Sequence, residues 1–206
     1  MTRLLLVRHG ETDWNREGRW QGHTGPGLNA AGREQAVALG RRLARLGPDL
    51  LVTSDLPRTL ETAERIASAT GLAIHPEPGL REVDVGSWAG RTPAEIQARD
   101  AVAYQRWLDG GTGWTDGETY EEMHARVLRT VSALLDRGLG ERIVLVAHGG
   151  TVRAVASWAT GHANHERRHL PSVRNCSLTV VDRWREIMRL ISFNDDGHLP
   201  PDPPPL

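Results

Sequence analysis

The 206-residue sequence contains no lysine, and all 25 of its basic residues are arginine. This absence excludes a P-loop lysine, a Schiff-base lysine and a Ser-Lys catalytic pair. Arginine is the planar, bidentate partner of phosphate and carboxylate groups. Codon bias explains most of the 25 equally well, so a functional argument has to depend on individual arginines.

The sequence also has little cysteine, little net charge and no long apolar run. A single cysteine, Cys176, cannot form an internal disulfide, which fits a reducing cytosol, and a small buried side chain is its favoured interpretation. No run of about 18 apolar residues is present to span a bilayer, and the N-terminal apolar run is too short for a signal peptide. The net charge of −1 gives no reason to expect nucleic acid or a membrane as a partner. We therefore expect a cytoplasmic protein.

The length and the apolar pattern predict one α/β domain over residues 1–199, with a Pro-rich tail, 200–206, that we expect to be disordered. Strand-like and helix-like segments alternate, which indicates a three-layer α/β/α sandwich around a mostly parallel sheet. Residues 14–28 are expected to form an ordered loop. Strands are predicted at 4–7, 50–52, 72–74 and 143–147, and two more β-rich runs are predicted at 177–181 and 187–192. Helices are predicted at 30–46, from Pro57 to Gly71, at 118–135 and at 151–159, and the pattern at 92–95 predicts the start of another.

Two predicted strands end in a histidine that glycine follows. The first delivers Arg8, His9 and Gly10, and the second delivers His148 and Gly149. The carboxyl ends of parallel strands meet at the ligand-binding edge of an open α/β sheet. Each motif alone is equally well explained as a solvated loop, but two such histidines are much less expected by chance than one.

A phosphate site can be assembled around these strand ends. Arg58 lies one turn beyond the end of the 50–52 strand, at the start of a helix whose dipole also favours anions. Arg8 and Arg58 are able to clamp one phosphate, beside which a histidine can act as a nucleophile and Glu82 as an acid. A surface ion pair of Arg58 with Glu61, and an exposed loop carboxylate at Glu82, stay open as alternatives.

Seven segments between Leu4 and Gly150 carry a more specific signal: Leu4–Thr12 with Asn15, Gly18–Gly22, Leu28–Ala36, Ser54–Ala63, Leu80–Gly90, Gly117–Thr119 and Val146–Gly150. In this order they resemble the histidine phosphatase superfamily, in the branch that also holds the cofactor-dependent phosphoglycerate mutases. The resemblance implies a phosphoglycerate mutase-like fold and a phosphatase that acts on small phosphorylated metabolites through a phosphohistidine. It implies no cofactor and no metal, because arginine and histidine supply the charge, and it makes a homodimer reasonable.

The resemblance also implies roles for particular residues. His9 would attack phosphorus, and Glu82 would protonate the departing oxygen and then activate water. Arg8, Arg58 and His148 would hold the phosphoryl oxygens. Asn15 and the backbone of Gly149 would add hydrogen bonds, and Gln21 and Gly22 would lie beside the substrate.

Two other functions remain as alternatives. A phosphoglycerate mutase-type phosphoryl transfer is one, although mutases of this family tend to be longer after the Glu82 loop. A non-catalytic protein that binds phosphate esters is the other, although binding alone needs neither His9 nor Glu82. Sugar phosphates, phosphoglycerate derivatives, phosphoserine and ribazole phosphate all stay open as substrates, with specificity expected in residues 91–114.

Further histidines and tryptophans allow weaker hypotheses. His162, His165 and His169 are spaced so that they share a helix face, but no cysteine is near, and solvated histidines are favoured over a metal site. Trp88, Trp107 and Trp114 are candidates for the substrate mouth, with core packing as the default for each.

Overall fold

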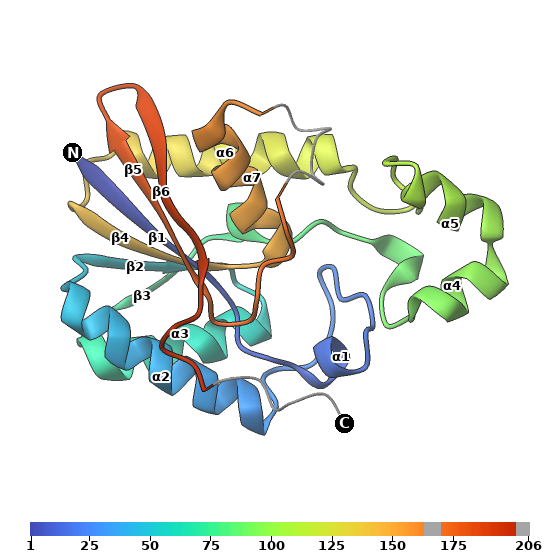
Figure 1. Cartoon of the computed structure of the whole chain (residues 1–206), viewed down its shortest axis with the longest axis horizontal. Coiled ribbons are helices and arrows are strands. Elements are labelled where there is room, and N and C mark those ends of the chain that lie inside the picture. Colours follow the sequence, from blue (N-terminus) through green and yellow to red (C-terminus); the bar gives the residue numbers. More distant parts are fainter. Residues whose placement is uncertain (163–169, 201–206) are drawn as a thin grey trace.

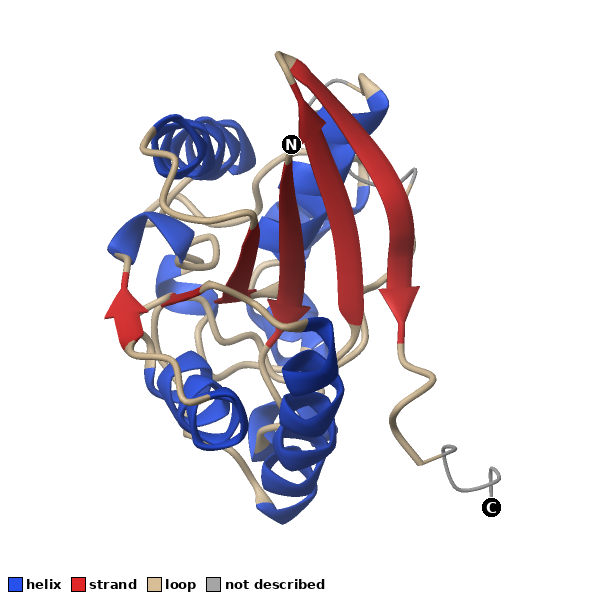
Figure 2. Cartoon of the chain, turned by 90° about the vertical axis from the view of Figure 1, so that its left-hand side faces the viewer, coloured by secondary structure: helices blue, strands red, loops and turns tan. Residues whose placement is uncertain are grey.

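A computed structural model describes residues 1–162 and 170–200. Its centre is a six-stranded sheet in the order β3-β2-β4-β1-β5-β6 (Figures 1 and 2). The strands are β1 (Thr2–Arg8), β2 (Leu50–Thr53), β3 (Ile74–Pro76), β4 (Arg142–Ala147), β5 (Leu178–Trp184) and β6 (Ile187–Asp195). Strands β3, β2, β4 and β1 run parallel, and β5 pairs antiparallel with both β1 and β6. The predicted mostly parallel sheet and the paired strands after residue 176 are confirmed.

Helices cover both faces of the sheet, as Figure 2 shows. Helices α2 (Ala30–Leu46) and α3 (Pro57–Thr70) lie on one side, and α6 (Tyr120–Asp136) and α7 (Gly149–Thr160) lie on the other (Figure 1). Strand β1 explains why both faces need cover: Leu4 and Leu6 pack in the core beneath α6 and α7, whereas Leu5 and Val7 pack in the core beneath α2 and α3. The three-layer sandwich is therefore confirmed.

Three small helices lie beyond the carboxyl ends of the strands: α1 (Asp13–Arg16), α4 (Pro93–Arg99) and α5 (Ala101–Leu108) (Figure 1). Two 3₁₀ turns, Pro78–Leu80 and Gly86–Trp88, connect β3 to α4. The start pattern at residues 92–95 is confirmed, since Thr92 and Glu95 form a capping box at α4. In the described part of the chain, no helix is both long and apolar enough to cross a membrane.

Several predicted boundaries are wrong, and strands β5 and β6 each end three residues later than predicted, at Trp184 and Asp195. Residues 14–28 do not form only a loop, because Thr12 and Asn15 form a capping box that starts α1. Strand β3 covers Ile74–Pro76 rather than 72–74, and Ile74 pairs with Leu51. This edge strand has one partner only, so its register follows β2 more than its own apolar residues. Of the predicted tail, Pro200 is described, and 201–206 lie outside the described residues.

Two glycines let the loop after β1 approach the start of α2. A Cβ on Gly32 would lie 2.1 Å from the carbonyl oxygen of Glu11, and a Cβ on Gly10 would lie 2.5 Å from that of Gly32. Since these neighbours are backbone atoms, neither side chain can be accommodated by a rotamer change. The close backbone contact fixes α2 against the loop that carries His9.

We expect Gly32→Ala to lower the free energy of unfolding by about 1–3 kcal/mol, because the methyl group forces α2 away from the loop. Chemical denaturation followed by circular dichroism measures the change. Gly197→Ala is the matched control, since a Cβ there meets only Asp195 Oδ1 at 3.4 Å. Equal midpoints for the two variants would contradict the steric argument.

Candidate active site

A pocket of about 530 Å³ opens at the carboxyl ends of β1, β2 and β4. Eight of the nine residues that the sequence predicted for the site line it. They are Arg8, His9, Asn15, Gln21, Gly22, Arg58, Glu82 and Gly149. The ninth, His148, is buried next to His9, with a ring-centroid distance of 5.3 Å. The structure thus brings all nine together.

The two histidines meet because β1 and β4 are parallel neighbours. Arg8 pairs in register with Ala147, so the residues that follow them emerge side by side. His9 Nδ1 lies 2.8 Å from the carbonyl oxygen of Gly10. A carbonyl only accepts, so Nδ1 carries the proton and Nε2 keeps its lone pair. His148 Nε2 lies 2.9 Å from the hydroxyl oxygen of Ser54 at the end of β2.

Arg58 is not a surface residue, and its predicted alternative pairing with Glu61 does not form. Its side chain is 1% exposed, and it donates to the carbonyl oxygens of Gly22 at 2.7 Å and Thr24 at 2.9 Å. Glu61 instead accepts from the backbone N–H of Leu28. The loop after α1 therefore holds the guanidinium in place.

Three side-chain nitrogen atoms around His9 have no hydrogen-bond partner within the described residues. They are Arg8 Nε, Arg58 Nε and His148 Nδ1, and each is fully buried. Arg8 uses Nη1 to donate to the carbonyl oxygen of Val173, at 2.6 Å. Buried polar groups almost always have a partner, so three such nitrogens around one histidine form an arrangement that fits an oxygen-rich anion.

The charges of the pocket shift the pKa values of its own members. Burial, Arg58 and Arg8 hold the pKa of His9 well below its usual value of 6.5. Burial and the same arginines, with His9, do the same for His148. Burial lowers the pKa of Arg58 to about 10, which leaves it charged at neutral pH. The pocket is thus cationic while both imidazoles are neutral.

Glu82 projects into the pocket from the loop before α4. Its carboxylate accepts from the backbone N–H of Val83 and from that of Gly150, each at 3.0 Å. Gly150 belongs to the first turn of α7, where the helix dipole favours a negative charge. Glu82 is half-buried and anchored, so the alternative of an exposed loop carboxylate does not hold.

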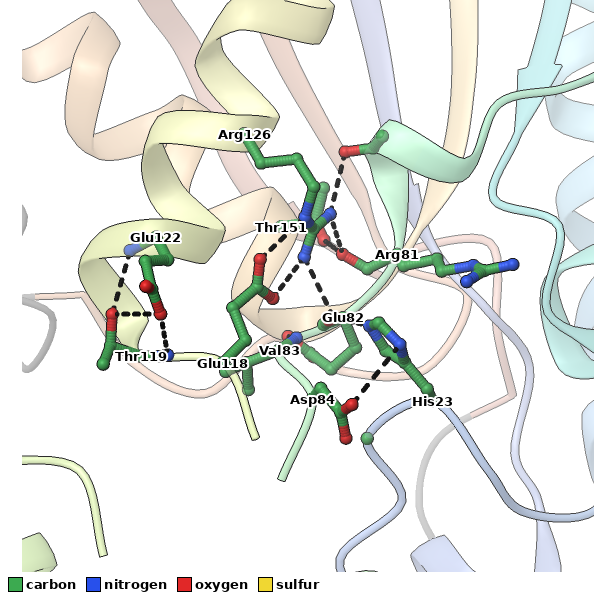
Figure 3. A network of polar contacts seen from close by, with 12 residues as sticks. His23, Arg81, Glu82, Val83, Asp84, Glu118, Thr119, Glu122, Arg126 and Thr151 are labelled. Atoms are coloured by element: carbon green, nitrogen blue, oxygen red, sulfur yellow. Dashed lines mark hydrogen bonds and ion pairs between the residues drawn. The ribbon is translucent and has the colours of Figure 1, made fainter. Parts of the chain in front are cut away.

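Arg126 of α6 binds the backbone of the loop that carries Glu82 (Figure 3). The sequence analysis did not identify this residue. Its Nη1 donates to the carbonyl oxygens of Gly79 and Arg81, each at 3.0 Å. Its Nη2 donates to the carbonyl oxygen of Glu82 at 3.2 Å. The carboxylate of Glu118 forms a bidentate ion pair with the same guanidinium. The Gly117–Thr119 motif was noted in the sequence, but its contact with Arg126 depends on how the chain packs.

Two further side chains bind the backbone near Glu82. His23 Nε2 lies 2.9 Å from the carbonyl oxygen of Glu82, and its Nδ1 lies 3.9 Å from a carboxylate oxygen of Asp84 (Figure 3). Thr151 Oγ1 donates to the carbonyl oxygen of Arg81, at 3.2 Å. The backbone that carries Glu82 is therefore held from α6, α7 and the loop after α1.

Asn15 and Gln21 line the pocket at its side. The Asn15 Oδ1 accepts from the backbone N–H of Thr12, at 3.1 Å, and from Asn175 Nδ2, at 3.3 Å. Because the oxygen is engaged, the amide nitrogen is the group left to donate to a ligand. Asn175, which sequence reasoning missed, also donates to the carbonyl oxygen of His9, at 2.9 Å. Gln21 is buried, and its Oε1 has no partner within the described residues.

The predictions for three tryptophans and for Cys176 can be compared with the structure. Trp88 and Trp114 are buried in the core, whereas Trp107 lines the pocket with Trp20, at a ring-centroid distance of 5.2 Å. Cys176 is fully buried in the core, as its favoured interpretation predicted, and burial raises the pKa of its thiol.

The three-histidine hypothesis is only partly within the described residues. His162 Nδ1 lies 2.9 Å from Thr160 Oγ1, and His165 and His169 lie outside the described residues. Over residues 1–162 and 170–200, no cluster of three or more His, Cys, Asp or Glu side chains has a metal-binding arrangement.

A comparison with known protein families shows to which family the chain belongs. The model of the histidine phosphatase superfamily (branch 1) matches residues 4–196. The chain belongs to this superfamily. Among curated relatives, a probable phosphoglycerate mutase, GpmB, of Salmonella arizonae is 37% identical over 185 residues, which cover 88% of this chain and 85% of the relative.

Solved structures of this superfamily are also similar. A mycobacterial glucosyl-3-phosphoglycerate phosphatase in complex with VO3 superposes with a TM-score of 0.86 at 32% identity, over 95% of this chain and 100% of that one. The α-ribazole phosphatase of Shigella flexneri superposes with a TM-score of 0.87 at 29% identity, over 95% and 97%. This histidine phosphatase-type chain is thus similar to enzymes named as phosphatases and as mutases.

Proposed function

We propose that this histidine phosphatase hydrolyses small phosphomonoesters without a metal ion, through a phosphohistidine on His9. The observation that carries the proposal is the set of three buried nitrogens around His9, on Arg8, Arg58 and His148, for which the described residues provide no partner. A phosphoryl group provides oxygen acceptors for such a set, and two guanidinium charges match its dianionic form. We assign the Ser54 hydroxyl as the donor to His148 Nε2, which leaves the His148 proton on Nδ1 for the phosphoryl group.

In the first step, His9 Nε2 attacks phosphorus in line with the ester oxygen. The P–N bond forms, the P–O bond to the alcohol breaks, and the Glu82 carboxyl gives its proton to the departing alkoxide. The hydrogen bond from His9 Nδ1 to the Gly10 carbonyl keeps the ring oriented for this attack. The lowered pKa of His9 keeps Nε2 unprotonated and nucleophilic at neutral pH.

In the second step, the Glu82 carboxylate takes a proton from a water molecule. The resulting hydroxide attacks phosphorus, the P–N bond breaks, and inorganic phosphate leaves with His9 restored. The Arg8 and Arg58 guanidinium groups stay charged throughout and stabilise the equatorial oxygens in both transition states. Asn15 and the backbone of Gly149 are proposed to donate further hydrogen bonds, while Gln21 and Gly22 contact the alcohol portion.

Phosphate release from a panel of phosphomonoesters, with EDTA present, tests this function. We expect turnover that EDTA does not reduce, and the best ester identifies the substrate class. No release from any ester would refute the phosphatase.

Interconversion of 2- and 3-phosphoglycerate tests the mutase alternative, which the GpmB relative favours. Here the phosphoryl group would return from His9 to the substrate rather than to water. Only α4, α5 and their connections lie between the Glu82 loop and α6, a short segment that supports the hydrolase instead. Ester binding without either reaction would identify the non-catalytic alternative.

Arg126 offers a test of how Glu82 is positioned. We expect Arg126→Met to lower kcat roughly 10- to 100-fold with little change in KM, because the loop that carries the acid loses three hydrogen bonds. Arg129→Met, one turn further along α6, is the matched control. The measurement is steady-state kinetics, with melting temperatures compared to show that the variants are equally folded. A change in KM alone would contradict a positioning role.

A further inference from the structure

Arg153 of α7 lines the pocket, and the proposed mechanism does not use it. It lies one helical turn after Gly149, which places its Cα about 6 Å further along the helix from the phosphate site. Gly149, Gly150 and Arg153 share one face of α7, because residues three and four apart are neighbours on a helix. Arg153 thus adds a positive charge to the part of the pocket wall that α7 forms.

The Arg153 guanidinium has no hydrogen-bond or ion-pair partner within residues 1–162 and 170–200. The other arginine in the outer pocket differs in this respect. Arg19 forms ion pairs with Glu17 and Glu95 and donates to the carbonyl oxygen of Gly90, at 2.7 Å. The charge of Arg19 is therefore compensated by the protein, whereas no described residue compensates that of Arg153.

The charges of Arg8 and Arg153 act on each other. Burial has the largest effect on the pKa of Arg8 and lowers it. Among the neighbouring charges, that of Glu82 raises this pKa and that of Arg153 lowers it. The two guanidinium groups are therefore close enough to repel each other in a partly desolvated pocket. A ligand that carries anions toward both groups relieves this repulsion.

A charge count indicates how much more anion the pocket can hold. A dianionic phosphate balances Arg8 and Arg58 once Glu82 is protonated, as the first step requires. Among residues 1–162 and 170–200, Arg153 then remains as one uncompensated positive charge on the pocket wall. A single carboxylate on the alcohol balances it, whereas a second dianionic phosphate would leave an excess negative charge.

We infer that Arg153 binds a carboxylate on the alcohol portion of the substrate, so that the enzyme prefers phosphorylated hydroxy acids to neutral phosphate esters. This inference rests on the proposed function, which places the phosphate beside His9. Guanidinium and carboxylate form bidentate, charge-assisted hydrogen bonds, which make the contact selective as well as attractive. Trp20 and Trp107 also line the pocket and provide apolar surface for the rest of the alcohol.

Two matched ester pairs test the inference: 3-phosphoglycerate against glycerol 3-phosphate, and phosphoserine against phosphoethanolamine. Within each pair the main difference is the carboxylate. Affinities are measured by calorimetry on His9→Ala, which removes turnover, with and without Arg153→Gln. Arg129→Gln on the same background is the control for the loss of one positive charge outside this pocket.

We expect the carboxylated ester of at least one pair to bind roughly 10- to 100-fold more tightly, and Arg153→Gln to remove that difference. Arg129→Gln is expected to retain it. Equal affinities within both pairs, or a difference that persists in Arg153→Gln, would overturn the inference. Turnover by the unmodified enzyme is assayed separately: a carboxylate preference in binding without any phosphate release would refute the hydrolase and leave the Arg153 contact standing.

Discussion

Replacing His9 by alanine is expected to lower phosphate release at least about 10⁴-fold, because the variant lacks the nucleophile that accepts the phosphoryl group in the proposed mechanism. Glu82 and the arginines remain, but in the proposed mechanism they assist cleavage of the P–O bond only while His9 attacks phosphorus. A labelled phosphoester, quenched in alkali and separated by denaturing electrophoresis, measures the intermediate directly. The native chain is expected to carry acid-labile, alkali-stable label, and His9→Ala to carry none.

His75→Ala is the matched control for His9→Ala, since His75 is exposed on edge strand β3. It is expected to retain both the turnover and the label. Labelling of the His9→Ala chain, or turnover within about tenfold of the native rate, would rule out His9 as the nucleophile.

The acid limb of the pH profile gives a second measurement on His9. Only neutral His9 attacks phosphorus, and burial with Arg58 and Arg8 holds its pKa well below 6.5. Lowering the pH through 6.5 therefore leaves His9 unprotonated, and kcat/KM, corrected for protonation of the ester dianion with its pKa of about 6, is expected to fall only at lower pH. A fall centred at 6.5 would indicate a solvated histidine instead.

Replacing Glu82 by glutamine is expected to lower kcat about 10²- to 10⁴-fold for esters of alkyl alcohols, whose alkoxides need a proton to leave. Glutamine keeps the shape of the side chain and an oxygen that can accept from Val83 or Gly150, so the loop stays in place. An ester with a good leaving group, p-nitrophenyl phosphate, needs no such proton. With this ester the first step is expected to proceed in the variant.

The second step also needs Glu82, to activate water. With p-nitrophenyl phosphate, Glu82→Gln is therefore expected to give a burst of nitrophenol and to accumulate phosphorylated His9. Glu141→Gln, at the opposite end of the sheet before β4, is the control and is expected to show neither effect. If both esters are slowed equally and no phosphoenzyme accumulates, Glu82 is not the acid and base of this reaction.

Several features of the molecule follow from local sequence. Helices α2 and α3 were predicted closely, and the structure shows that their ends carry local signals: Asn29 caps α2, Pro57 begins α3, and Gly47 and Gly71 end them at positive φ. The apolar runs of β1 and β4 predicted buried parallel strands. Because such strands present their carboxyl ends at one edge, the proximity of His9 and His148 also followed from sequence.

Other features depend on contacts between distant segments. The start of β3 is set by pairing with β2, so its local apolar residues misplaced it. The burial of Arg58 depends on the carbonyl oxygens of Gly22 and Thr24, 36 and 34 positions away. No periodicity in the sequence around Arg58 distinguishes this arrangement from a surface ion pair.

The sequence by itself therefore determined the fold class, the succession of the sheet strands and of the four helices that cover them, and the residue types that meet at the phosphate site. Only the tertiary structure decided which arginines support or extend that site. Arg126 and Arg153 are unremarkable positions on amphipathic helices. Their roles arise because α6 packs behind the Glu82 loop and α7 begins at the pocket. The physical reason is that strand ends and caps are encoded locally, whereas a side chain's partner depends on the packing of segments far apart in the chain.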